Sequence, residues 1–232
     1  MKKFLLLFFV LCGSNLFAQT KDAEKILDAV KKKFDAVRDY EVDVSIKLDF
    51  EFVKMPDTKA KIYFKQPDKV KIDSKGFAML PKQSLNFSPK QFLNGKYTAI
   101  YVKTETVDGS KLDVVKIIPE SDSAGIVLST LWIEQAQSVI RKIETTAKRS
   151  GTVKVELTYD NKNLGLPSQL KFNFSAEKSQ QQNVSPENKD DQDEHNIRWR
   201  DRSELSGSVI VTYSNYKINK GIPDSFFEEK KK

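Results

Sequence analysis

The sequence predicts a mainly β protein with one helix near its N-terminus, built around a broad antiparallel sheet that faces water on one side. Three observations predict this class. Residues 42–52 alternate apolar and polar side chains without a miss, which places the apolar ones on a single face of a strand. Shorter alternating runs follow, separated by turn signals. Residues 22–38 alone show a sustained helical spacing.

Residues 1–18 have the character of a secretory signal peptide. A basic start precedes the uninterrupted apolar run 4–11, and Ala18 supplies the small residue expected before the cleavage point. The run is too short for a stable membrane-spanning helix. We therefore expect a single mature domain over residues 19–232 in the periplasm of a Gram-negative bacterium. This domain would lack cysteine, because Cys12 lies in the leader.

The charge balance restricts the partners. The chain carries 39 basic and 32 acidic residues, a net charge of +7. Such a surface is compatible with transient contact to anionic membranes or to envelope proteins. Export argues against nucleic acid as a partner, and we expect a monomer.

The predicted helix covers residues 22–38. Thr20 or Asp22 is suited to cap its start, and Lys31, Lys32 and Lys33 fall largely on its outer face. The apolar residues that form its inner face are Ile26, Leu27, Val30, Phe34 and Val37.

The remainder is mostly strand. Proline turns precede residues 58–65 and 69–74, and Asp108-Gly109 is a strong hairpin signal. Strands are expected at residues 42–52, 58–65, 69–74, 97–106, 112–118, 126–133, 139–147, 152–159, 168–174 and 207–218.

Two stretches break the pattern. Residues 76–93 are apolar, yet they have neither strand nor helical period, and long apolar loops of this kind are often lids or binding loops. Residues from about 179 to 196 are rich in Gln, Asn, Asp and Glu, which predicts a flexible excursion between two strands.

Little in the sequence supports catalysis. The single histidine, His195, ends a polar loop and is expected to be solvated. The acidic run 190–194 has neither the spacing nor the glycine of a calcium loop. The basic-aromatic run 198–202 around Trp199 either docks on a membrane or simply enters the last strand, and we favour the latter. We expect no cofactor, no metal and no enzymatic activity.

The order of several short segments resembles that of the LolA-like periplasmic lipoprotein carriers and outer-membrane lipoprotein-sorting proteins. After the helix and long strand come residues 60–72 (AKIYFKQPDKVKI), where a strand meets a proline turn and a second strand. The end is similar, with residues 213–219 (YSNYKIN) followed by 222–227 (IPDSFF). Residues 131–134 and 166–168 fall where related proteins place comparable strand signals. The resemblance spans most of the mature chain.

This resemblance implies an unclosed antiparallel half-barrel whose concave face is covered by the N-terminal helix and by lid loops or helices. A hydrophobic cavity for acyl chains would lie between them. These carriers are thought to hold the lid closed with an arginine on an early strand. In this sequence the first strand has only Lys47, which faces the other way, while Arg38 precedes the strand and Arg141 lies on a later one. No residue of this sequence therefore corresponds to the arginine that holds the lid closed in that family.

The predicted function is a periplasmic carrier that binds lipid or lipoprotein acyl chains for transfer toward the outer membrane. The alternating strands alone favour an ordinary packed core without space for a ligand. The order of the LolA-like segments favours a cavity instead. An envelope protein-interaction or regulatory module that reuses the fold is the alternative, and a hydrolase with carboxylates brought together in the cavity is a third option. The expected ligand contacts are Val44, Ile46, Leu48, Phe50, Ile62, Phe64 and Ile72 from the strands, with Phe77, Met79 and Leu80 from the lid.

Overall fold

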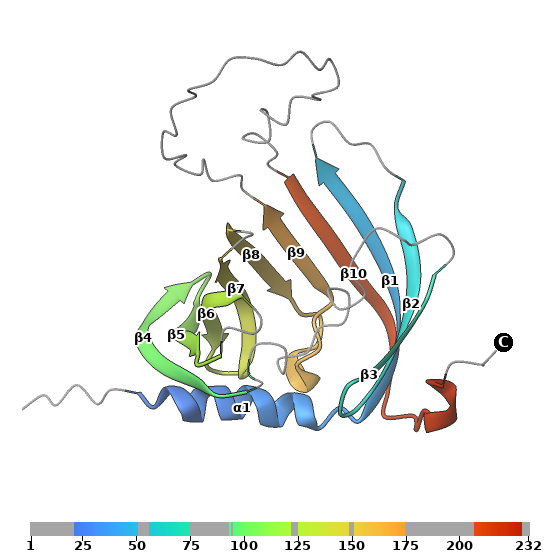
Figure 1. Ribbon diagram of the computed structural model, residues 1–232, viewed down its shortest axis with the longest axis horizontal. Coiled ribbons are helices and arrows are strands. Elements are labelled where there is room, and N and C mark those ends of the chain that lie inside the picture. The colour runs from blue at the N-terminus through green and yellow to red at the C-terminus, as the bar shows by residue number, and fades with distance from the viewer. Residues whose placement is uncertain are drawn as a thin grey trace, which may run out of the picture.

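The computed structural model describes residues 21–50, 56–74, 93, 95–121, 125–148, 151–174 and 207–228, and these residues include the helix α1 and a ten-stranded sheet (Figure 1). The helix α1 spans Ala23–Asp35. The strands are β1 (Asp39–Phe50), β2 (Thr58–Lys65), β3 (Lys69–Asp73), β4 (Tyr97–Val107), β5 (Ser110–Pro119), β6 (Ile126–Glu134), β7 (Val139–Ala147), β8 (Gly151–Thr158), β9 (Gln169–Phe174) and β10 (Gly207–Ile218). The short 3₁₀ turns are η3 (Lys162–Leu164) and η5 (Asp224–Phe226).

The sheet is antiparallel throughout and is not closed. Its order is β3-β2-β1-β10-β9-β8-β7-β6-β5-β4, so strands that follow one another in the chain are neighbours except β3 and β4, and β10 pairs with β1. Within the described residues no ladder joins the edge strands β3 and β4. The predicted half-barrel is therefore confirmed. Figure 1 shows the sheet curving strongly, with β4 and β3 at its two edges.

Every predicted strand is present, with ends that shift by at most a few residues. The prediction for β1 began at residue 42, but the strand starts at Asp39, whose carboxylate accepts hydrogen bonds from the backbone amides of Lys220 and Gly221. This long-range contact buries Asp39. The sequence carried no signal for this contact, because Asp39 is simply a polar residue at the start of an alternating run.

The hairpin predicted at Asp108-Gly109 joins β4 to β5. Both residues have positive φ, 49° and 73° respectively. Positive φ at both central positions defines a type I′ turn, whose twist matches that of the flanking strands. The residue pair thus determines the register of the two strands, with Val107 opposite Ser110.

Helix α1 is shorter than predicted and lies across one end of the sheet, along the lower side of the view (Figure 1). The Asp22 carboxylate caps it by accepting from the amides of Glu24 and Lys25. The helix ends at Asp35, three residues before the predicted end, and the amide of Val37 closes a turn onto the Phe34 carbonyl. Its buried residues are Ala23, Leu27, Val30 and Phe34.

The lysines of α1 correct the predicted outer face. Lys32 is exposed, but Lys31 and Lys33 are half-buried because each reaches a neighbouring element. The Lys31 ammonium donates to the Tyr97 hydroxyl at 2.7 Å, and that of Lys33 donates to the Gln137 carbonyl. The helix is therefore held to the sheet by its flanks as well as by its apolar face.

Both unusual stretches of the sequence lie almost wholly outside the described residues. Of the proposed lid, Leu93 is described, and it is buried in the hydrophobic core. The excursion at 179–196, His195 and the run 198–202 are all outside the described part of the chain.

Candidate functional site

The concave face of the sheet carries an unbroken apolar row that crosses eight strands. Register places its members directly opposite one another from strand to strand. Because cross-strand partners project to the same side, they form one continuous surface. In sheet order from β1 to β4 the row reads Leu48, Val209, Phe172, Val155, Ile143, Leu131, Val115 and Tyr101.

The concave face is covered unevenly along the strands. At the α1 end of β1, Val42, Val44 and Ile46 are each at most 3% exposed, whereas Leu48, further along, is half-buried. Strands β9 and β8 repeat this gradient, whereas on β10 the residue opposite Leu48, Val209, is buried. Leu170 is buried and Phe172 is half-buried on β9, and Leu157 is buried and Val153 is half-buried on β8. The helix therefore fills one end of the hollow and leaves the apolar side chains of the other end less covered.

The predicted ligand contacts divide along this gradient. Val44 and Ile46 are buried, while Leu48 and Ile72 are half-buried. Ile62 and Phe64 are fully enclosed near α1. The Phe64 ring lies 5.8 Å from that of Phe34 and 5.1 Å from that of Tyr40, between centroids. Their position favours a core role.

Four predicted contacts belong to the part of the chain that the structure does not describe. Phe77, Met79 and Leu80 lie outside the described residues, as does the side chain of Phe50. Their role in ligand binding stays a prediction.

The prediction overlooked the contribution of the later strands to the concave face. Val153, Phe172 and Val209 share that face with Leu48. The period-two alternation of β8, β9 and β10 was visible in the sequence. What the sequence lacked was the pairing of β10 with β1, which joins the two alternating sets into one surface.

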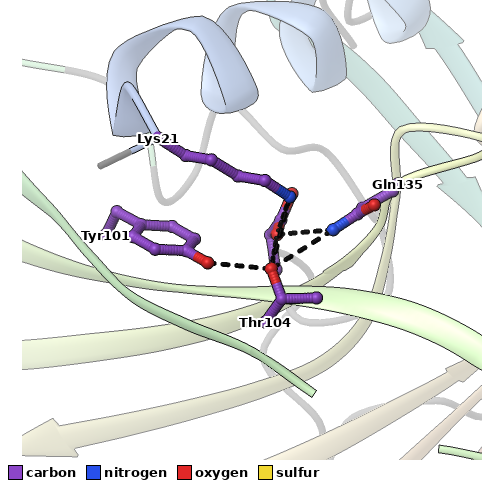
Figure 2. Close-up of polar contacts among 5 residues, drawn as sticks. Lys21, Tyr101, Thr104 and Gln135 are labelled. Atoms are coloured by element: carbon purple, nitrogen blue, oxygen red, sulfur yellow. Dashed lines mark hydrogen bonds and ion pairs between the residues drawn. The ribbon is translucent and has the colours of Figure 1, made fainter. Parts of the chain in front are cut away.

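A polar cluster joins the segment before α1 to strands β4 and β5. The buried Asp113 carboxylate of β5 accepts from the Lys21 ammonium at 2.7 Å, the Thr104 hydroxyl at 2.6 Å and the Gln135 amide at 2.8 Å. Figure 2 shows Lys21, Tyr101, Thr104 and Gln135 converging on this point from three parts of the chain, with Tyr101 and Thr104 both on β4 and their hydroxyl oxygens 2.8 Å apart.

Electrostatics keep the Asp113 carboxyl ionised. Burial alone would raise its pKa, but the hydrogen bonds from Lys21, Thr104 and Gln135 and the nearby positive charge outweigh burial, so that its pKa is lowered from the ordinary value. Asp113 and Lys21 thus form a salt bridge that joins the segment before α1 to β5.

The described residues offer no metal centre. They contain no group of three or more His, Cys, Asp or Glu side chains placed to hold a metal ion. In the same part of the chain, no helix combines the length and the apolar character needed to cross a membrane.

Comparison with known proteins identifies the fold. No model of a protein family matches the sequence. No curated protein matches it either. Among solved structures, an outer-membrane lipoprotein-sorting protein domain from Vibrio parahaemolyticus aligns with 89% of this chain and 97% of its own, at a TM-score of 0.58 and 11% identity. The fold is LolA-like.

Two further structures agree with this assignment. A LolA superfamily protein from Nitrosomonas europaea covers 90% of this chain and 98% of its own, at a TM-score of 0.57 and 14% identity. A DUF1329 family protein from Desulfovibrio piger covers the same shares at a TM-score of 0.58 and 13% identity. The LolA-like resemblance read from the order of short segments is thereby confirmed at the level of fold.

Proposed function

We propose that this LolA-like protein binds the acyl chains of a lipid or lipoprotein on its concave face and carries them through the periplasm toward the outer membrane. The observation that carries the proposal is the apolar row from Leu48 to Tyr101, which is continuous across eight strands and half-buried at Leu48 and Phe172. The solved structure from Vibrio parahaemolyticus that is described as an outer-membrane lipoprotein-sorting protein domain has this fold and supports the proposal.

Apolar contact alone supplies the binding free energy in this proposal. Burial of a methylene group contributes about 0.8 kcal/mol, so a chain of sixteen carbons gains on the order of 12 kcal/mol before ordering costs are subtracted. This gain offsets most of the cost of removing the chain from a bilayer. Because it is spread over many contacts, no single side chain is decisive and no catalytic group is required.

The test is a pair of charges placed in the half-buried part of the row. The double variant Leu48→Asp with Phe172→Asp should lose at least ten-fold in affinity for a fluorescent long-chain fatty acid, because each carboxylate would have to be desolvated against the bound chain. Mass spectrometry of lipids that co-purify with the protein from a Gram-negative envelope should show the same loss.

The matched control is Val70→Asp with Val107→Asp, which alters two exposed apolar residues away from the row. Circular dichroism would verify that both double variants fold. Unchanged fatty-acid affinity in a folded Leu48→Asp, Phe172→Asp protein would contradict the proposal.

The proposed location follows from the leader-like residues 1–18 together with the fold. Expression of the full chain in a Gram-negative host should yield a periplasmic protein that begins at Gln19, as measured by intact mass after osmotic shock. Retention of the leader in the cytoplasmic fraction would contradict this part of the proposal.

One observation favours a second candidate function, partner binding at the edge strand β4. Ile100, Val102 and Val107 on this strand are each 44% exposed, and β4 has a neighbour on one side only within the described sheet. Long exposed edge strands are templates for adding another strand. Crosslinking at Ile100 in envelope preparations, with Val70 on β3 as the control position, would distinguish a protein-binding module from a carrier.

A further inference from the structure

A second polar cluster surrounds the Glu134 carboxylate at the end of β6, on the rim that α1 crosses. The Lys162 ammonium contacts its two oxygens at 2.9 and 3.0 Å, and Arg141 Nη1 donates to Oε2 at 2.9 Å. The Glu134 side chain is only 6% exposed. Two cations therefore converge on one buried carboxylate.

A bulge in the sheet positions Arg141. Lys142 lies opposite Trp132 and Ile140 opposite Ile133, so Arg141 is the extra residue of β7 at this point. Bulges are concentrated next to functional sites because they redirect a side chain out of the regular alternation. Here the bulge turns the guanidinium toward Glu134, instead of leaving it in register with β6.

A third cation comes from α1. The side chain of Lys33 packs beside Gly165, at the end of η3, and its ammonium donates to the Gln137 carbonyl. Burial lowers the pKa of Lys33, attraction to Glu134 raises it, and repulsion by Lys162 lowers it further, with a net decrease. The charges of Lys33, Glu134 and Lys162 therefore act on one another.

The cluster has more positive charge than its carboxylate can neutralise. Arg141 and Lys162 contact Glu134 directly, and Lys33 interacts with it electrostatically, so these four residues carry three positive charges and one negative charge. In addition, Nε of Arg141 is buried and has no hydrogen-bond partner in the described part of the molecule. Buried donors are nearly always paired in native structures, so this guanidinium nitrogen is an unused donor in a cluster that already carries excess positive charge.

We propose that Arg141, Lys162 and Lys33 form a binding site for a phosphate group. A phosphate monoester carries close to two negative charges at neutral pH and so matches the excess of the cluster. The planar guanidinium suits phosphate oxygens, and the lysines add point charges. The Arg141 and Lys162 side chains are 34% and 32% exposed, which leaves the site accessible from solvent. None of these residues belongs to the apolar row.

Calorimetry with inorganic phosphate, at ionic strength matched with chloride, tests the proposal on the full protein. The wild type should bind saturably, and Arg141→Gln should bind at least ten-fold more weakly. Lys142→Met is the matched control, because Lys142 is the next residue of β7 but lies over the Trp132 ring, 4.1 Å from its centroid. It should bind like the wild type.

Glu134→Gln gives the sharper test. Removal of the resident carboxylate leaves three cations without a counter-ion, so phosphate should bind several-fold more tightly than to the wild type. A purely structural cluster predicts no binding in either protein. If Glu134→Gln fails to fold, the comparison of Arg141→Gln with Lys142→Met decides the question.

A second titration distinguishes the sources of the phosphate group. A water-soluble short-chain phosphatidic acid that binds more tightly than inorganic phosphate would identify a lipid headgroup, and equal affinities would identify a free phosphate. Absence of saturable binding of both probes, or equal affinities of Arg141→Gln and Lys142→Met, would overturn the proposal. Fatty-acid binding measured on the same preparations separates this failure from failure of the acyl-chain proposal.

Discussion

Asp113 shows how one buried carboxylate can make the attachment of a helix depend on pH. Its partners come from the segment before α1, from β4 and from the turn after β6, so a single ionised group joins three elements. The pKa of its carboxyl in the folded protein is lowered. The unfolded chain, with an Asp pKa of about 3.9, therefore binds more protons than the folded one as the pH falls through this region.

The resulting prediction concerns acid stability. The contribution of Asp113 is complete above about pH 5 and is lost on acidification through its lowered pKa. Asp113→Asn should cost about 1–3 kcal/mol in the free energy of unfolding at pH 7 and less at pH 3. Urea denaturation of both proteins at several pH values measures this. Asp49→Asn, at an exposed position of β1, is the control and should change little. An equal loss at pH 3 and pH 7 would contradict the role of the charge.

At the scale of elements, the β4–β5 hairpin depends on the backbone conformation of Gly109. Its φ of 73° is unfavourable for side chains other than Gly and Asn, while a Cβ placed there would meet nothing within 4 Å. Substitution is therefore penalised by backbone strain alone, without any steric clash.

This separation makes a clean prediction. Gly109→Ala should lower the free energy of unfolding by about 1–2 kcal/mol, whereas Gly109→Asn should cost less because asparagine tolerates this region. Thermal or urea denaturation measures both. If the two variants were equally destabilised, the turn would not require the positive φ described here.

The whole sheet should show graded protection from hydrogen exchange. Strands β9 and β10 have neighbours on both sides, whereas β3 and β4 are edges. Half of the amides of an edge strand lack a ladder partner. Exchange measured by mass spectrometry should therefore be slowest in β9 and β10 and fastest in β3 and β4. Protection of β4 equal to that of β10 in the purified protein would show that this edge is already covered and would count against the partner-binding alternative.

Local signals in the sequence were sufficient to predict the strands, and the resemblance in the order of short segments predicted the LolA-like fold. The predicted first and last residues of β2, β7 and β10 match the structure, because the alternation of apolar residues and the flanking turn residues are signals that lie close together in the chain. The candidate site was predicted only in part. Leu48 and Ile46 were identified from β1, but Phe172 and Val209 join them only through the β1–β10 ladder, which links residues far apart in the chain.

The polar clusters were beyond sequence reasoning for a similar reason. Lys33 and Arg141 lie on different elements, and each appears unremarkable in its local context. Their relation to Glu134 depends on a bulge in β7 and on the path of α1 across the rim. Neither feature has a signature in a single sequence.

The place of β10 between β1 and β9 has a consequence for biogenesis. The ribosome makes β1 early and β10 late, so β1 and β9 have no common neighbour until synthesis is almost complete. Translation therefore yields a chain that stays open for most of its time on the ribosome. The β1–β3 and β4–β9 parts of the sheet are therefore joined only after β10 has been made.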